Sequence, residues 1–236
     1  MIEESQADFI CLQEVVADFM EEIIKNKHIQ DNYYISGNDI NDYGLLILSK
    51  WPVYFYEFKF SNSWMGRSLL VAEVVYRRQK AFSEKNYKYD TFLISTSHLE
   101  SLDNKLKRGE QMKYIQNKVL KGHDSIFMGD FNFDYKWKDE STHLDRDNYF
   151  DLWEELKDPK EEAYTMNGTT LFKPVVLDHI LLSKNSAFTP EFITRVGNFC
   201  CRNFSHDLID EIREDDVVRT PSDHLGLYAT IKKSYD

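Results

Sequence analysis

Residues 125–132 read Ser125-Ile126-Phe127-Met128-Gly129-Asp130-Phe131-Asn132, an apolar run that ends in a glycine and two polar side chains. A run of this length is too short for most helices and is typical of a strand buried in a sheet. Gly129 lets the backbone turn sharply. If strand geometry continues, Asp130 and Asn132 point to the same side. They offer a carboxylate and an amide for chemistry, although an Asx-type turn that ends a strand explains the same residues.

Six further apolar runs of similar length predict a sheet of many strands. They cover residues 9–12, 44–48, 68–75, 91–96, 177–182 and 225–231. Helical periodicity is confined to residues 13–25, 108–121 and 149–157. Many strands with few helices indicate a layered α/β sandwich rather than a regular alternation of strand and helix. Five prolines and nine glycines are too few for a long linker, so we expect one domain over residues 1–236.

Composition restricts the possible functions. The chain has 29 basic and 40 acidic residues and a net charge of −11, which argues against coating nucleic acid by bulk charge. An enzyme that reaches a phosphodiester through a divalent cation remains possible. No apolar run approaches the roughly 20 residues that span a bilayer, and the first residues lack signal-peptide features. We expect an intracellular protein, nuclear or cytoplasmic, with Cys11, Cys200 and Cys201 as reduced thiols.

Polar side chains with catalytic potential lie at the ends of other apolar runs. Glu14 follows the first run, where a carboxylate could bind a hard cation or stabilise a helix N-terminus. His98 lies among hydroxyl side chains and could contact a phosphate or be a buried, hydrogen-bonded histidine. His224 follows Asp223, and Asp178 is a second carboxylate that could orient it; spacing does not decide between them. Together, the motifs predict one acidic, histidine-containing metal site at the rim of a sheet.

In their order along the chain, these motifs resemble those of the endonuclease/exonuclease/phosphatase family of metal-dependent phosphodiesterases. The matching stretches are residues 12–14, 97–99, 129–132, 177–180 and 222–224, with a glycine-led strand at 43–50. The flanking stretches 65–70, 96–101, 108–112 and 151–156 are most similar to the 5′-tyrosyl-DNA phosphodiesterase branch. The core motifs are shared with nucleases, deadenylases, sphingomyelinase-like enzymes and phosphatases, which remain alternatives.

The resemblance implies a two-sheet α/β sandwich and a phosphodiesterase that uses Mg²⁺, with Mn²⁺ as a substitute, on 5′-phosphotyrosyl DNA ends in DNA repair. It also implies a monomer that binds DNA ends. The implied metal ligands are Glu14 and Asp223; the implied catalytic residues are Asp130, Asn132, His98, His224 and Asp178; the implied substrate contacts are Ser101 and Arg67. In these roles, Asp130 activates the attacking water, Asn132 positions the phosphate, and the two histidines stabilise the charge that develops on it.

Two departures from the family pattern affect these expectations. The family begins with a strand that carries an asparagine near the metal, whereas here Met1 lies only eight residues before Phe9. We therefore expect an N-terminally truncated domain with an exposed sheet edge, and a non-catalytic phosphate-binding module is an alternative. In addition, residues 164–167 read Tyr-Thr-Met-Asn and lack a tryptophan of the tyrosyl-DNA branch. The basic stretch 108–121 could contact DNA or form a solvated face.

Overall fold

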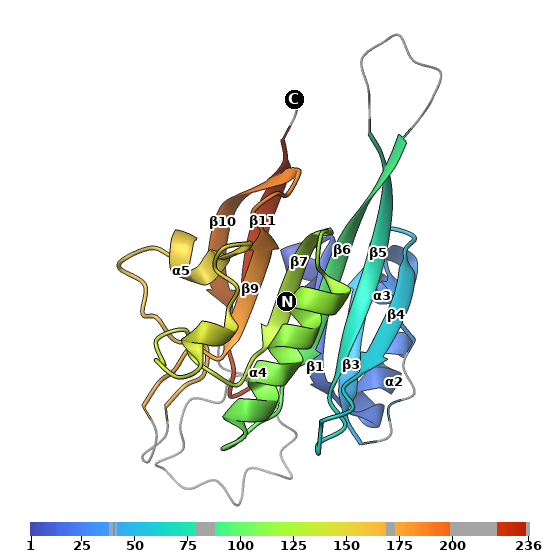
Figure 1. Ribbon diagram of the computed structural model, residues 1–236. Coiled ribbons are helices and arrows are strands. Elements are labelled where there is room, and N and C mark those ends of the chain that lie inside the picture. Colours follow the sequence, from blue (N-terminus) through green and yellow to red (C-terminus); the bar gives the residue numbers. More distant parts are fainter. Residues whose placement is uncertain (38–39, 41, 79–87, 169–172, 199–220, 235–236) are drawn as a thin grey trace, which may run out of the picture.

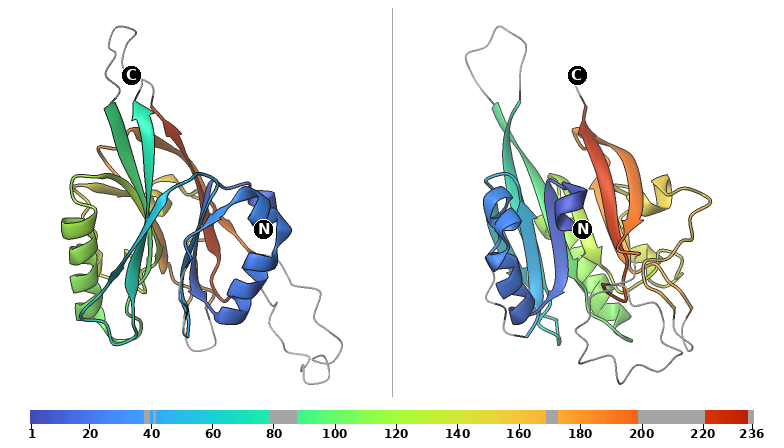
Figure 2. Two further views of the ribbon diagram at one scale, coloured as in Figure 1. Left: turned by 90° about the vertical axis from the view of Figure 1, so that its right-hand side faces the viewer. Right: turned by 180° about the vertical axis from the view of Figure 1, so that it is seen from behind.

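Two layers of strands lie face to face in the computed structural model, with helices on their outer sides (Figures 1 and 2). The structure describes residues 1–37, 40, 42–78, 88–168, 173–198 and 221–234. One layer is a six-stranded sheet, and the other consists of a three-stranded and a two-stranded sheet. This arrangement confirms the two-sheet α/β sandwich that the sequence predicts.

The six-stranded sheet carries three of the predicted site residues, His98, Asp130 and Asp178, and has the order β4-β5-β6-β7-β9-β8. Its strands are β4 (Tyr54–Lys59), β5 (Ser68–Arg78), β6 (Lys88–His98), β7 (Asp124–Asp130), β8 (Tyr149–Asp151) and β9 (Asp178–Ser183). Strands β6 and β7 are parallel, and the other neighbours are antiparallel. Because β6 and β7 run in the same direction, the side chains that follow both strands meet at one edge of the sheet.

The second layer packs on the other face of this sheet. Its strands are β1 (Phe9–Val15), β2 (Tyr34–Ile35), β3 (Gly44–Ser49), β10 (Phe188–Val196) and β11 (Gly226–Lys233). The strand orders are β1-β3-β2 and β10-β11. Strand β1 packs against β6 and β7, whereas β11 packs against β9. Buried apolar side chains such as Ile47, Leu70, Ile94, Ile126 and Ile180 fill the space between the layers.

Five α-helices lie in the described part of the chain: α1 (Ile2–Ser5), α2 (Ala17–Lys25), α3 (Lys27–Asn32), α4 (Lys105–Tyr114) and α5 (Leu152–Leu156). Figure 2 shows α2 outside the smaller layer and α4 outside the six-stranded sheet. Helix α4 covers a second core that includes Leu99, Met112 and Phe127. None of the described helices has the length and apolar composition needed to cross a membrane.

The three predicted helices exist, but their bounds were wrong. Residues 13–15 continue β1, and α2 begins at Ala17. In the stretch 149–157, residues 149–151 form β8, and the Asp151 side chain accepts hydrogen bonds from the Trp153 and Glu154 N–H groups to begin α5. The stretch 108–121 divides into the end of α4 and a π-helical turn, Ile115–Val119. In each case, apolar periodicity identified the helix but not its ends.

All seven predicted apolar runs form strands, and two longer strands were missed. Strand β4 is an edge strand with four exposed residues, and β10 contains Pro190 at a register shift. Neither has the continuous apolar run that identifies a strand buried on both faces.

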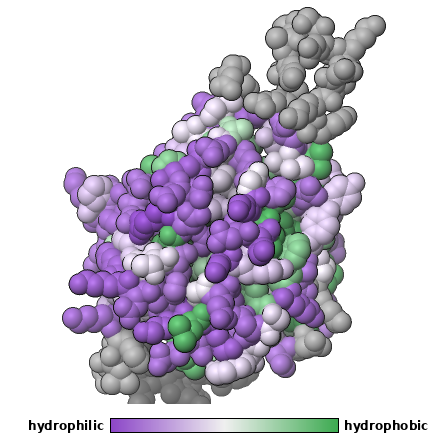
Figure 3. All heavy atoms as spheres, in the orientation of Figure 1, coloured by the Kyte–Doolittle hydropathy of each residue, from purple (hydrophilic) through white to green (hydrophobic). Residues whose placement is uncertain are grey.

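The face of the molecule in Figure 3 is mainly hydrophilic, with apolar side chains gathered in small patches.

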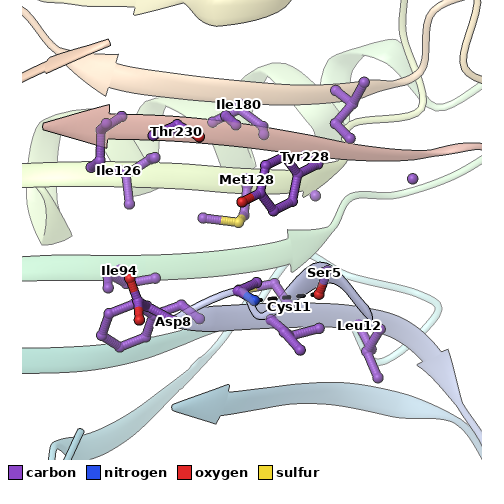
Figure 4. Close-up of a pocket in the computed structure, with 18 of the residues that line it drawn as sticks. Ser5, Asp8, Cys11, Leu12, Ile94, Ile126, Met128, Ile180, Tyr228 and Thr230 are labelled. Atoms are coloured by element: carbon purple, nitrogen blue, oxygen red, sulfur yellow. Dashed lines mark hydrogen bonds between the residues drawn. The ribbon is translucent and has the colours of Figure 1, made fainter. Parts of the chain in front are cut away.

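A groove separates the two parts of the smaller layer. Among the described residues, β1 pairs only with β3, and β11 pairs only with β10. The space between them, here called the β1–β11 groove, has a volume of about 1040 Å³ and is lined by residues 1–2, 4–13 and 226–231 together with residues of β5, β6, β7 and β9. Figure 4 shows Cys11 and Leu12 on one side and Tyr228 and Thr230 on the other.

Cys11 is a free thiol on the wall of this groove. Burial raises its pKa to about 12, although a hydrogen bond with Thr96 opposes this shift. The thiolate is the reactive form of cysteine, so Cys11 has the character of an inert core residue. Cys200 and Cys201 lie outside the described residues.

Candidate active site

Three polar residues stand in a row across adjacent strands of the six-stranded sheet. In the register of the sheet, His98 on β6 is paired with Asp130 on β7, and Asp130 is paired with Asp178 on β9. His98 Nε2 lies 3.3 Å from Asp130 Oδ2. The strand ends therefore bring together residues that are far apart in the sequence.

The same alternation that directs Asp178 into the site directs His179 into the core. His179 is buried between aromatic rings, with ring centroids 4.9 Å from Phe131 and 5.8 Å from Phe133. Its Nδ1 lies 2.7 Å from Asp151 Oδ2, and its Nε2 lies 2.9 Å from the Phe133 carbonyl oxygen. Adjacent residues on a strand thus serve the site and the fold separately.

Gly129 permits the close pairing of β6 and β7 just before Asp130. Its φ is +149°, and a β-carbon at this position would lie 2.1 Å from the Ser97 carbonyl oxygen. A larger residue would push the end of β7 away from β6 and displace Asp130 from His98. Gly129 is therefore required for two reasons: the Ser97 carbonyl oxygen leaves no room for a side chain, and the backbone has a positive φ.

The fourth polar residue, His224, comes from a turn that residues 165 and 166 hold in place. Met166 forms a β-bridge with His224, and the Leu225 N–H donates to the Thr165 carbonyl oxygen at 2.6 Å. The buried Thr165 Oγ1 accepts from the N–H groups of Leu177 and Asp178, each at 3.0 Å. Thr165 thus connects the start of β9 to the His224 turn.

These contacts produce a compact cluster of Asp130, Asp178 and His224. His224 Nδ1 donates to Asp178 Oδ2 at 2.8 Å. One potential ligand atom from each of the three residues lies within 4.8 Å of the other two. The geometry settles the alternative that spacing left open, because Asp178 and not Asp223 orients the His224 ring.

Arg67 fixes the protonation of the other histidine. Arg67 Nη1 donates to His98 Nδ1 at 2.8 Å, and Arg67 Nη2 donates to Ser101 Oγ at 3.0 Å. An arginine cannot accept a hydrogen bond, so His98 Nδ1 carries no proton and Nε2 is the N–H of the ring. The guanidinium carbon also lies 5.1 Å from the centroid of the Tyr43 ring.

The two histidines of the site differ in charge. Burial, the positive charge of Arg67 and that of His224 lower the pKa of His98 to about 3, so this ring is neutral. Burial also disfavours a charged His224, but the hydrogen bond to Asp178 and the charges of Asp178 and Asp130 outweigh it. They raise the pKa of His224 to about 9, and this ring is an imidazolium. One histidine is a neutral donor and the other a charged donor.

Asp130 is buried beside a second carboxylate. Burial and the negative charge of Asp178 raise the pKa of Asp130 to about 7, against the opposing effect of His224. A pKa near neutrality suits a group that accepts a proton from water. A divalent cation beside these oxygens would offset the repulsion between the carboxylates, and carboxylate oxygens are preferred ligands of Mg²⁺. The residue types and their spacing thus fit a metal of this kind.

Glu14 lies at the exposed rim of the site, at the end of β1. Its backbone has φ +54°, at a register shift between Leu12 and Val15. The side chain is 67% exposed, and Glu14 Oε1 lies 3.6 Å from His98 Nδ1. The preceding Gln13 donates to Thr96 Oγ1 at 2.8 Å and attaches this end of β1 to β6. Glu14 therefore faces the site without belonging to the cluster of Asp130, Asp178 and His224.

Asn132 lies beyond the end of β7, with φ +55°. Its N–H donates to Asp130 Oδ1 at 2.8 Å, and its Nδ2 donates to the Leu99 carbonyl oxygen at 3.2 Å. The Asx-type turn that the sequence left as an alternative therefore exists, and it holds the Asp130 carboxylate. The condition of continued strand geometry is not met, because β7 ends at Asp130.

The structure gathers most of the predicted site residues around one centre. Glu14, Arg67, His98, Ser101, Asp130, Asn132, Asp178 and His224 are connected by the contacts described above. Asp223 is exposed, and Ser222 Oγ donates to its carboxylate at 3.4 Å. Thr165 was not singled out as a site residue, since only its backbone and hydroxyl contacts reveal its position.

The fold and this site define a class of proteins: two-layer α/β sandwiches with carboxylates and imidazoles clustered at the strand ends. The chain belongs to the Endonuclease/Exonuclease/phosphatase family, whose family model matches residues 1–224. Members of this family are generally hydrolases that act on phosphate esters and use a divalent metal. No curated protein sequence matches the chain significantly.

Solved structures with a similar fold are distant in sequence. D. rerio TDP2 complexed with single strand DNA product has a TM-score of 0.72 and 21% identity, covering 98% of this chain and 88% of that chain. A mannosyl-6-phosphatase from Bacteroides thetaiotaomicron has a TM-score of 0.65 and 18% identity, covering 98% and 88%. The human Nocturnin catalytic domain with bound sulfate anion has a TM-score of 0.63 and 15% identity, covering 99% and 83%. At these identities, the similarity establishes the fold alone.

Proposed function

We propose that this protein is a Mg²⁺-dependent phosphodiesterase that hydrolyses 5′-phosphotyrosyl DNA ends in DNA repair, with Mn²⁺ as a substitute metal. The observation that carries the proposal is the row of His98, Asp130 and Asp178 across three strands, with His224 bonded to Asp178. The similarity of the fold to a TDP2 structure with a DNA product supports the choice of substrate.

Asp130 accepts a proton from the attacking water. With a pKa of about 7, a substantial fraction of Asp130 is ionised at neutral pH, and the ionised carboxylate is basic enough to accept a proton. The Asn132 N–H holds one carboxylate oxygen, which leaves the other directed toward His98. The Asn132 amide positions the phosphate beside this carboxylate.

The two histidines stabilise the charge that develops on the phosphate oxygens. His224 does so as an imidazolium, and Asp178 orients its ring so that Nε2 is the donor left for the substrate. His98 does so as a neutral ring whose Nε2–H is fixed by the hydrogen bond from Arg67 to Nδ1. The leaving group is a phenoxide, which requires less protonation than an alkoxide and suits a site without a strong general acid.

Glu14 at the rim would hold the metal, with Asp223 as a further ligand through water. Bound there, Mg²⁺ supplies a positive charge that polarises the scissile phosphate. Arg67 and Ser101, joined by a 3.0 Å hydrogen bond, contact the DNA backbone next to the phosphate. Within the basic stretch 108–121, Arg108 is not available to contact DNA, because it is buried in an ion pair with Glu140.

Incubation of the purified protein with Mg²⁺ and a 5′-tyrosyl oligonucleotide tests this proposal. We expect release of a 5′-phosphate end, lost in EDTA and in the Asp130→Ala variant. Hydrolysis of a generic aryl phosphodiester without hydrolysis of this DNA would assign the chain to a nuclease, deadenylase, sphingomyelinase-like or phosphatase activity of the same family.

The β1–β11 groove favours a second candidate function, a phosphate-binding module without turnover. The groove ends at Gln13, Gly129 and Asp178, so one side of the candidate site is open. Water that enters there would weaken the electrostatic stabilisation that catalysis needs. Binding of a 5′-phosphorylated oligonucleotide with no hydrolysis of any phosphodiester in Mg²⁺ or Mn²⁺ would support this second function.

A further inference from the structure

Three large apolar side chains stand in solvent beside the candidate active site. Trp64, Leu102 and Leu106 are 80%, 79% and 78% exposed, and together they are called the Trp64 shelf. Trp64 belongs to the turn between β4 and β5, Leu102 to the loop after β6, and Leu106 to the first turn of α4. Scattered exposed apolar residues need no explanation, but these three lie on adjoining segments that buried polar groups hold in place.

The turn that carries Trp64 is fixed by a buried carboxylate. Glu100 is fully buried and accepts from the Trp64 N–H at 2.8 Å and from Ser63 Oγ at 2.7 Å. Gln111 on α4 donates to the same carboxylate at 3.1 Å. A buried charge is costly unless it is hydrogen-bonded in this way. Glu100 thus holds the Trp64 backbone rigidly while the indole points outward.

The loop that carries Leu102 is held by a second buried charge. Arg108 donates to the carbonyl oxygens of Glu100 at 2.9 Å and Leu102 at 2.7 Å, and its guanidinium is paired with Glu140 at 2.6 Å. Leu102 has φ +62°, a strained conformation for a leucine. Strain of this kind persists where the surroundings impose it, commonly at ligand sites.

The Trp64 shelf continues directly into the phosphate-facing residues. Met65, next to Trp64, accepts through its sulfur from Ser101 Oγ at 3.2 Å. Ser101 in turn accepts from Arg67, which bonds His98 at 2.8 Å. A group attached to a phosphate at Arg67 and His98 therefore lies next to the shelf.

One face of the Trp64 ring already carries a cation. Lys107 Nζ lies 3.9 Å from the ring centroid and donates to the Asn62 carbonyl oxygen, which fixes the ammonium there. This contact orients the indole plane and leaves the opposite face toward solvent. A flat π-system is the group that such a face binds best, because stacking on tryptophan is tolerant of sequence and needs no hydrogen bonds.

We propose that Trp64 stacks on the nucleobase that adjoins the phosphate bound at Arg67 and His98, with Leu102 and Leu106 flanking the base. This inference rests on the proposed function, since it assumes that a nucleotide end enters the site. A membrane surface is the competing ligand for exposed Trp, Leu and Lys side chains. The carboxylates of Asp103 and Glu110 near the shelf and the net charge of −11 disfavour an anionic bilayer. They also limit the contact with DNA to the terminal nucleotides.

A binding cycle isolates the stacking contribution. The probe is a short 5′-phosphorylated oligothymidylate in Mg²⁺, compared with the same strand lacking its 5′-terminal base, and affinity is measured by fluorescence anisotropy. For the unmodified protein, removal of the base weakens binding about tenfold, in the range of one stacked base. For Trp64→Ala the two strands bind equally, and Trp64→Phe retains part of the preference. Trp51→Ala, which truncates a tryptophan 55% exposed on the loop after β3, keeps the full preference.

Three results overturn the proposal: equal binding of both strands by the unmodified protein, the same base preference in Trp64→Ala, or no binding of the oligonucleotide. Sedimentation with phosphatidylcholine vesicles that is lost in Trp64→Ala, without a base preference, identifies the shelf as a membrane anchor instead. Hydrolysis of the 5′-tyrosyl oligonucleotide is measured separately on the same samples. Base-dependent binding without hydrolysis upholds the shelf and rejects the proposed function, and hydrolysis without base dependence does the reverse.

Discussion

His98 and Asp130 lie opposite each other at the ends of the parallel strands β6 and β7, with His98 Nε2 3.3 Å from Asp130 Oδ2. Because the pKa of His98 is about 3, this contact joins a neutral imidazole to a carboxyl group and is not an ion pair. Arg67 donates to the other ring nitrogen, so the Nε2–H points toward Asp130. The strand register thus sets the direction of a proton at the centre of the site.

Replacement of Asp130 by asparagine tests whether this carboxylate is the base. Asn keeps the size of the side chain but cannot take a proton from water, so we expect hydrolysis to fall by about 10²–10⁴-fold. The rate of product release from a 5′-tyrosyl oligonucleotide gives the measurement. The matched control is Asp147→Asn, which changes an exposed carboxylate on the loop before β8 and should leave the rate unchanged. A similar loss in both variants would contradict the assignment.

Removal of the metal tests the role of Glu14. EDTA should abolish hydrolysis, and added Mg²⁺ or Mn²⁺ should restore it. In Glu14→Gln the ligand loses its charge, so we expect half-maximal activity to require about tenfold or more Mg²⁺. A titration of rate against Mg²⁺ concentration provides the comparison, with Glu22→Gln as the control for an exposed glutamate on α2. An unchanged Mg²⁺ requirement in Glu14→Gln would show that the metal is held by other residues.

The pairing of His224 with Asp178 makes a prediction for the metal-free protein. The Asp178 carboxylate stabilises the charged ring and is the main cause of its pKa of about 9. In Asp178→Asn this charge is lost, so the His224 pKa should fall toward or below its ordinary value. NMR titration of the His224 ring protons in EDTA measures the shift. Asp223→Asn should lower the pKa much less, because Asp223 contributes the smallest effect.

The sequence predicts this centre because its main residues end apolar runs. His98, Asp130 and Asp178 each adjoin a strand that is buried on both faces, and such strands are recognisable without a structure. His224 adjoins a further apolar run, and the resemblance to the family places it at the same centre. The candidate site residues on central strands could therefore be predicted from the sequence.

Contacts that depend on the strand register and on turns could not be predicted from the sequence. The bond from Arg67 to His98 depends on the pairing of Leu69 with Ser97, which no local pattern fixes. The hydroxyl of Thr165 reaches the start of β9 only because residue 166 forms bridges with both Val175 and His224. Likewise, the basic pattern around Arg108 suggested a surface face, whereas the side chain is buried against Glu140.

Gly129 should be far less replaceable than other glycines with positive φ. In Gly129→Ala, the new methyl group would overlap the Ser97 carbonyl oxygen, and we expect a loss of about 3 kcal/mol or more in the free energy of unfolding. Gly122→Ala is the control, since Gly122 has φ +76° but no atom within 4 Å of the added carbon. Backbone strain alone should cost about 1 kcal/mol there. Urea unfolding of both variants provides the test, and equal losses would contradict the steric argument.

Glu100 should make the free energy of unfolding depend on pH in the acidic range, around and below the ordinary pKa of a glutamate. Burial alone would raise its pKa, but hydrogen bonds from Ser63, the Trp64 N–H and Gln111 outweigh burial and lower it. Because the pKa of Glu100 is lower in the folded state, its carboxylate stabilises the folded protein at pH values above the unfolded pKa of about 4.3. This stabilisation is lost as the pH falls through the folded-state pKa. In Glu100→Gln this contribution is absent. Urea unfolding should therefore show a variant that is less stable at pH 7, with the difference shrinking below about pH 4; a difference that stays constant with pH would show that the Glu100 charge does not hold the Trp64 turn.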